Sequence, residues 1–129
     1  MTNATIKSTT DALAELLQPS NRLPVTDLMR ATRAYAAYTA AWAPAEEVRL
    51  RIISERGTEQ ADGTVSVEKG DVEGFLQDLN VLLAEEVEAV EADSFSLDGG
   101  YTKAEDGDRI ALDLSAGAVM ALLEADLIK

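Results

Sequence analysis

The longest periodic pattern in the chain runs from Leu23 to Gly57, where apolar side chains recur at the three- and four-residue intervals of an α-helix. Pro24 or Thr26 is suited to begin this helix, and Gly57 is suited to end it. The expected apolar stripe consists of Val25, Leu28, Met29, Thr32, Tyr35, Ala36, Thr39, Trp42 and Ala43. Such a long amphipathic arm does not fold alone, so its stripe must be covered by the rest of the chain or by another molecule.

Pro44 interrupts this pattern. Proline lacks an amide hydrogen and its ring crowds the preceding turn, so it kinks or breaks a helix. We therefore predict a kink, or a division into two helices, between Trp42 and Glu46. Beyond this point the apolar surface continues at Val48, Leu50, Ile52 and Ile53.

Shorter patterns predict further helices on both sides of the arm. Ala4–Lys7 reads as a short edge strand, followed by a helix with its apolar face at Ala12–Leu17 and its end at Pro19. Asp71–Leu83 predicts an amphipathic helix, and Ser115 is suited to cap a final one. The residues suited to cap the first helix are Ser8, Thr9 and Thr10.

Strand patterns are confined to the second half of the chain. Asp98-Gly99-Gly100 and Asp106-Gly107 are turn signals. The expected strands are Thr64–Val67, Glu85–Glu91, a hairpin of Ser94–Leu97 with Tyr101–Lys103, and Arg109–Leu114. Together these elements predict a single α+β domain over residues 1–129, with a helical arm region at 1–57 and an acidic α+β region at 58–129. A kinked helical arm and two or three further helices should pack on a small antiparallel sheet.

Composition narrows the possible chemistry. Hydrophobic residues make up 47% of the 129 residues, which is typical of a globular domain. The chain has no Cys and no His, which removes disulfides, thiolate nucleophiles, imidazole bases and the usual zinc ligands. The N-terminus lacks the pattern of a secretory signal, and no apolar run is long enough to span a membrane.

The net charge of −13 is unevenly distributed. Residues 1–57 carry seven basic and six acidic side chains, a balance of +1, whereas residues 58–129 carry four basic and 18 acidic side chains, a balance of −14. This acidity fits a solvated surface, a halophilic source, a surface for a basic partner, or self-assembly through the Arg-bearing arm. Direct binding to nucleic acid is not expected, because the phosphates would be repelled.

Acidic clusters are the only candidates for catalysis or metal binding. Glu105, Asp106 and Asp108, and Asp93 with Asp98, lack the spacing of a calcium-binding EF-hand loop. The scarcity of aromatic residues argues against the cleft of a glycosidase, and no nucleotide or nucleophile motif is present. We therefore expect no enzymatic activity, no cofactor and no metal.

Aromatic residues of the arm, with two nearby arginines, are the candidate partner-binding site. Tyr, Trp and Arg are enriched at binding hot spots, although core packing is the alternative for the aromatic side chains. The candidate residues are Arg30, Arg33, Tyr35, Tyr38 and Trp42.

The order of these elements resembles a family of small tailed-phage proteins, a phage domain of unknown function. Over nearly the whole chain, the matching pieces are Ile6-Lys7, Ala12–Leu17, Leu23-Pro24-Val25, Pro44-Ala45-Glu46-Glu47, Glu55-Arg56-Gly57, Leu79–Leu83, Glu85–Val90 and Ser115–Leu123. The Ala-rich arm and the hairpin around Gly99–Gly107 depart from the family pattern, and no functional residues come with the resemblance.

The resemblance implies a non-enzymatic phage structural or assembly protein, associated with the virion and acting through protein–protein contacts. The alternative is a phage-encoded regulator or anti-defence protein that binds a host protein through its acidic surface. In either case the partners are other protein chains, virion or host proteins, or further copies of this chain. The location is then the virion or the host cytoplasm.

Overall fold

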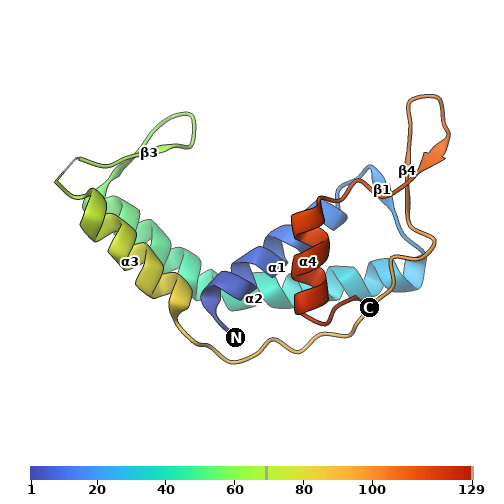
Figure 1. Cartoon of the computed structure of the whole chain (residues 1–129), viewed down its shortest axis with the longest axis horizontal. Coiled ribbons are helices and arrows are strands. Elements are labelled where there is room, and N and C mark those ends of the chain that lie inside the picture. Colours follow the sequence, from blue (N-terminus) through green and yellow to red (C-terminus); the bar gives the residue numbers. More distant parts are fainter. Residues whose placement is uncertain (69, 129) are drawn as a thin grey trace.

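The computed structural model describes residues 1–68 and 70–128 and has the predicted α+β architecture. Its helices are α1 (Asn3–Leu16), α2 (Val25–Arg56), α3 (Val72–Ala84) and α4 (Ala116–Glu124). Its strands are β1 (Asn21–Arg22), β2 (Thr58–Glu59), β3 (Val65–Ser66), β4 (Tyr101–Lys103) and β5 (Arg109–Ile110). Figure 1 shows α2 running through two regions of the molecule. We call residues 1–45 and 85–128 the body, and the described residues between 46 and 84 the lobe.

Helix α1 begins earlier than the sequence predicted, and the expected strand at Ala4–Lys7 is wrong. The Thr2 side chain caps the helix by accepting a hydrogen bond from the Thr5 amide at 3.2 Å. Ile6 is fully buried on the core side of α1. The predicted cap Thr9 lies inside the helix, where its hydroxyl donates to the Thr5 carbonyl at 2.8 Å. The segment is helical because this face packs into the core, which a helix buries along its whole length.

Helix α2 is one continuous helix of 32 residues that includes Pro44. The predicted start and end are close to those observed, with Pro24 at the N-cap and Gly57 at the C-cap. Figure 1 shows that α2 changes direction in its middle part, between the body and the lobe. The predicted kink is therefore present, but the helix is not divided in two. Pro44 is exposed, so its ring lies on a side where the helix can open without disturbing the core.

The side of α2 that faces the core differs from the predicted stripe. Of the predicted stripe, only Trp42 is buried, and Tyr35 is half-buried. The buried side of α2 in the body is made mostly of small residues, namely Ala31, Ala34, Tyr38, Trp42 and Ala45. Both sides of this helix have apolar spacing, so periodicity alone did not identify the correct one. The alanines face the core because they allow close approach of a neighbouring helix.

A small antiparallel sheet, in the order β1-β4-β5, lies at one end of the body. The predicted hairpin was displaced by one turn: β4 pairs with β5, around the turn at Gly107, rather than with Ser94–Leu97. Gly107 has a φ of 86°, a conformation that favours glycine. Of the predicted strand Arg109–Leu114, only Arg109 and Ile110 are in a strand. In the lobe, β2 and β3 form a second hairpin, so the strand expected at Thr64–Val67 is present over two residues.

The predicted strand at Glu85–Glu91 is wrong. This segment is extended but has only one isolated bridge, between Thr2 and Glu86. It crosses the body along α2 and, beyond Glu91, it leads to Phe95, which is buried and whose amide donates to the Leu127 carbonyl at 2.8 Å. We call residues 85–94 the strap. Its alternating pattern reflects side chains that turn inward at intervals, and among the described residues the segment pairs with another only at the bridge of Glu86.

Asn21 attaches the sheet to the helices. Its buried side-chain amide donates to the carbonyls of Leu16 and Asp113, each at 3.1 Å, and its oxygen accepts from the Thr102 hydroxyl at 2.6 Å. Thr102 is also the residue that pairs with Asn21 between β1 and β4. One polar side chain therefore connects the end of α1, the sheet and the segment before α4.

Helices α3 and α4 lie where the sequence predicted them. Ser115 caps α4 by accepting from the Ala118 amide at 3.1 Å. Helix α4 packs on α1, and α3 packs on the lobe half of α2. The most deeply buried side chains all belong to the body: Ile6, Thr9, Leu13, Leu16, Tyr38, Leu122 and Leu127.

Candidate functional site

The five predicted partner-binding residues do not form one exposed surface. The side chains of Tyr38 and Trp42 are only 1% and 7% exposed, and burial raises the pKa of Tyr38. Both belong to the core, which is the alternative that the sequence left open. Tyr35 is half-buried, whereas Arg30 and Arg33 are exposed. An interface anchored on Tyr38 and Trp42 is therefore excluded while the body is folded.

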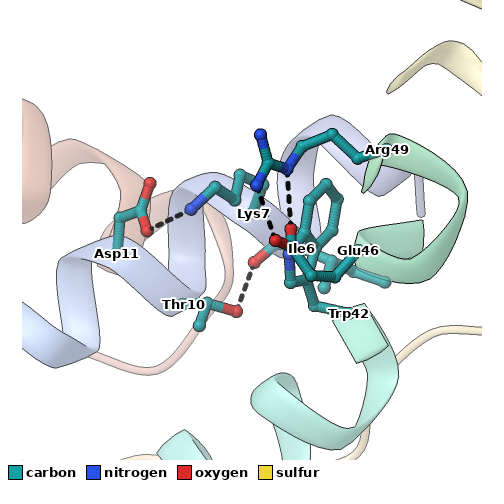
Figure 2. Close-up of polar contacts among 7 residues, drawn as sticks. All are labelled: Ile6, Lys7, Thr10, Asp11, Trp42, Glu46 and Arg49. Carbon is teal, nitrogen blue, oxygen red and sulfur yellow. Dashed lines mark hydrogen bonds and ion pairs between the residues drawn. The ribbon is translucent and has the colours of Figure 1, made fainter. Parts of the chain in front are cut away.

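Trp42 lies at the centre of a polar cluster that joins α1 to α2 (Figure 2). Its indole nitrogen donates to Glu46 Oε2 at 3.1 Å, and the Lys7 ammonium lies 5.7 Å from the centre of the indole ring. Arg49 donates to both carboxylate oxygens of Glu46, at 2.9 and 2.7 Å. These hydrogen bonds from Arg49, followed by the one from Trp42, hold the pKa of Glu46 below its usual range, although partial burial opposes this effect.

The cluster orients side chains but contains no group arranged for catalysis. The Lys7 ammonium forms an ion pair with Asp11 of the same helix at 2.8 Å. Positive and negative side chains of α1 and α2 therefore alternate around the indole ring of Trp42. All the charged groups are neutralised by a neighbour of opposite sign. We interpret the cluster as a contact that fixes the crossing of α1 over α2.

Arg30 and Arg33 face the strap across a small groove of about 370 Å³. The opposite wall contains Glu91 and Asp93. Within residues 1–68 and 70–128, neither arginine forms an ion pair. The two arginines therefore share one groove with two carboxylates and do not form an isolated basic patch.

A different side of α2 is exposed and mostly uncharged, with Arg33 as the exposed charged residue at helical spacing from Met29 and Ala36. We define the outer face as the surface of α2 that points away from the core in the body. Val25, Leu28 and Met29 on this face are 73%, 42% and 50% exposed. The members of the outer face are Val25, Leu28, Met29, Thr32, Ala36, Thr39, Ala40 and Ala43, and all are exposed. A contiguous exposed apolar surface of this kind is a candidate for a protein contact.

The sequence contained the signal for the outer face and left open whether the rest of the chain or another molecule covers it. Seven of its eight members belong to the predicted apolar stripe, Ala40 being the exception. They repeat at helical spacing and carry no charge. The same pattern suits a helix that covers its own core and one that binds a second protein.

A second hollow lies where α2 bends. This groove has a volume of about 580 Å³, and its apolar wall includes Ile6, Pro44 and Val48. Glu85 and Glu88 of the strap lie at its edge. The groove contains no cluster of groups suited to catalysis, and its chemistry is that of an apolar surface bordered by carboxylates.

The acidic residues weighed for metal binding are dispersed. Glu105, Asp106 and Asp108 are exposed in the β4–β5 turn, where an Asp106 carboxylate oxygen accepts from the Asp108 amide at 3.0 Å. In the described part of the chain, no group of three acidic side chains is placed to hold a metal ion. Asp93 lines the groove that contains Arg30 and Arg33. Asp98 lines a different groove, beside Phe95.

Comparison with known proteins gives no relative from which a function can be inferred. The chain matches no model of a protein family, and no curated protein and no solved structure is significantly similar to it. Among the described residues, no helix is both long enough and apolar enough to cross a membrane.

Proposed function

We propose that this chain is a non-enzymatic protein that assembles with other protein chains, and that it is a component of a tailed-phage particle. The observation that supports assembly is the outer face of α2, where Val25, Leu28 and Met29 are exposed beside small uncharged residues. Burial of such a surface releases about 25 cal/mol for each Å² of apolar area, which favours association. The phage setting rests on the resemblance in the order of elements along the chain.

This proposal includes the location and the partners of the chain. The location is the virion, and the partners are virion proteins, without direct contact to nucleic acid or membrane. The excess of acidic groups supports the exclusion of nucleic acid, since 24 acidic residues oppose 11 basic ones.

The test uses two exposed methionines as a matched pair. Met29 lies on the outer face and is 50% exposed, and Met120 lies on α4 and is 59% exposed. Particles of the phage that carries the gene are purified with wild type, Met29→Glu or Met120→Glu, and the chain is quantified by mass spectrometry. We expect wild type and Met120→Glu in the particles and at least a tenfold loss of Met29→Glu. Absence of the wild-type chain from particles would contradict a virion component.

A regulator or anti-defence protein is the second candidate, and the strap favours it. Glu85, Glu86, Glu88, Glu91 and Asp93 are all exposed along this extended segment. A basic surface on a host protein would complement them. This function predicts that the chain is absent from particles and is recovered with a host protein. That complex should dissociate as salt rises and should be weakened by Glu88→Lys but not by Met29→Glu.

Measurement of turnover tests the proposal that the chain has no enzymatic activity. Glu105, Asp106 and Asp108 lie within four residues of one another in the acidic region. A defined turnover that is abolished by a single substitution at one of them would contradict the proposal.

A further inference from the structure

The groove at the bend of α2 lies where the body and the lobe meet. Its volume of about 580 Å³ is within the usual range of ligand-binding pockets. Part of its wall belongs to α2, through Pro44 and Val48, and part belongs to the strap, through Val87 and Val90. Because Val48 is 45% exposed, apolar surface in the groove is open to a binding partner.

The strap beside this groove has an unpaired main chain. The amide of Val87 donates to the Met1 carbonyl at 2.7 Å, and the next bonded amide is that of Phe95, which donates to Leu127. In the part of the chain that the structure describes, residues 88–94 neither donate nor accept a hydrogen bond. An extended segment with free amides and carbonyls is a template for pairing with another extended chain.

The charge at the groove is negative. Glu85 and Glu88 line it and are exposed. Neither carboxylate forms an ion pair with any residue that the structure describes, and none of the lining residues is Lys or Arg. The groove is therefore complementary to a cationic partner and unfavourable for an acidic one.

We propose that this groove binds an extended segment of a partner protein in which apolar residues alternate with Lys or Arg. The main chain of that segment pairs with the strap over residues 88–94 as an added strand. Its apolar side chains pack on Pro44 and Val48, and its basic side chains face Glu85 and Glu88. The inference deepens the second candidate function and rests on it, because it names the kind of segment through which a basic partner reaches the strap.

The free main chain of the strap favours an extended segment over other cationic partners. A helix satisfies its own main-chain groups, so a basic helix would leave residues 88–94 unpaired. A small organic cation could use the carboxylates of Glu85 and Glu88 but would supply no ladder of hydrogen bonds. An added strand uses the main chain, the apolar wall and the carboxylates together.

A peptide titration of the full chain, followed by NMR, tests the proposal. The probe is Lys-Val-Lys-Val-Lys-Val, blocked at both ends, and we expect a dissociation constant on the order of 100 μM because the contact is small. The amides of residues 88–94 should shift, and alternate ones should exchange more slowly as they gain acceptors. The same peptide with Glu in place of each Lys should bind at least tenfold more weakly. Equal binding of the two peptides, or no binding of the lysine peptide at millimolar concentration, would overturn the proposal.

Two exposed apolar residues of α2 give a matched pair of variants. Val48 and Leu50 are 45% and 47% exposed, but only Val48 lines the groove. Val48→Ser should weaken binding of the lysine peptide at least fivefold, and Leu50→Ser should not change it. Glu88→Gln should cause a loss of about threefold and a smaller dependence on salt, whereas Glu105→Gln in the β4–β5 turn should cause neither. Equal losses for Val48→Ser and Leu50→Ser would place the peptide elsewhere and overturn the proposal.

N-methylation of the probe separates main-chain pairing from side-chain contacts. One peptide has N-methyl groups on its lysines and another has them on its valines. An added strand pairs through the amides of alternate residues only, so one of the two peptides should lose at least tenfold in affinity and the other should retain it. Full affinity of both peptides would show that no strand is added and would overturn the proposal.

The same assays separate this inference from the proposed functions. Met29→Glu should not change peptide binding, because Met29 does not line the groove. If the lysine peptide binds but the chain is recovered with no host protein, the groove is supported and the second candidate function fails. If a host protein is recovered but the lysine peptide does not bind, the groove inference fails and that function stands.

Discussion

The body and the lobe share one long helix but differ in how much apolar surface they bury. In the body, Ile6, Leu13 and Leu122 have no exposed surface, and α1, α2 and α4 pack around them. In the lobe, Leu82 is the buried residue of α3, while Leu76 and Val81 are 52% and 66% exposed. A buried Leu or Ile contributes about 1.5–3 kcal/mol, so the body has the larger share of the stabilising free energy. Stability should therefore differ along α2 itself.

This difference separates two kinds of exposed apolar surface. In the lobe, apolar side chains are exposed because few other residues pack against them, as expected of a region with a small hydrophobic core. The outer face, in contrast, belongs to the well-packed body, where the other side of the same helix is buried. An apolar face on a rigid helix loses little conformational entropy on binding. The body is therefore the better location for a specific contact.

The largest expected effect comes from two adjacent leucines of α4. Leu122 has no exposed surface, whereas Leu123 is 44% exposed. Leu122→Ala should lower the free energy of unfolding by about 3 kcal/mol, because it leaves a cavity against α1. Leu123→Ala should cost less than about 1 kcal/mol. Urea denaturation followed by the fluorescence of Trp42, the only tryptophan, measures both. Equal losses for the two variants would contradict the central position of α4 in the body.

The next effect concerns the polar junction between the sheet and the helices. Asn21→Ala should lower the free energy of unfolding by about 2 kcal/mol, because the Thr102 hydroxyl and the carbonyls of Leu16 and Asp113 lose a buried partner. Asn80→Ala is the matched control, since Asn80 is exposed on α3. The same denaturation assay applies. A neutral Asn21→Ala would mean that the sheet is not anchored through this side chain.

The lobe should open without unfolding of the body. Native-state hydrogen exchange should show faster exchange of α3 amides than of α1 amides. Asp78→Asn removes the 2.6 Å ion pair with Arg56 and should accelerate exchange in α3 by a few-fold at most, because both side chains are more than a third exposed. Glu55→Gln, an exposed change nearby, should leave exchange unchanged. Uniform protection across α1 and α3 would show that the chain unfolds as one unit.

The sequence predicted the elements that carry local signals. Ser115 and Pro24 mark helix starts through capping and fixed backbone geometry, and Gly57 marks a helix end. Pro44 correctly predicted a change of direction in α2. These features depend on the residue and its immediate neighbours, so no knowledge of the tertiary structure was needed.

Features that depend on distant partners were not predictable. Whether Glu85–Glu91 forms a strand depends on a neighbouring strand that periodicity does not reveal, and the segment has only the bridge at Glu86. Likewise, the two sides of α2 both have apolar spacing, and only the tertiary packing decides that Ala34 is buried and Ala36 is exposed. Two of the five candidate residues are buried for this reason: Tyr38 and Trp42 had the composition of a hot spot but pack in the core.

The smallest predicted effect lies at the junction of the two regions, where Glu46 follows the bend of α2. The pKa of Glu46 is lowered in the folded chain, chiefly by Arg49, so its carboxylate stabilises the fold above its ordinary pKa. This stabilisation is lost as pH falls through the lowered pKa. Because the side chains of Glu46 and Arg49 are 36% and 37% exposed, solvent screening limits the contribution to less than about 1 kcal/mol.

Glu46→Gln should therefore be slightly less stable than wild type at pH 7, and the difference should diminish at acidic pH. Urea denaturation at a series of pH values measures this, and Glu47→Gln is the matched control. Glu47 contacts Arg51 at a longer distance of 3.4 Å, and both side chains are more than 70% exposed. If the difference between wild type and Glu46→Gln stayed constant to pH 3, the ion pair with Arg49 would not be its source.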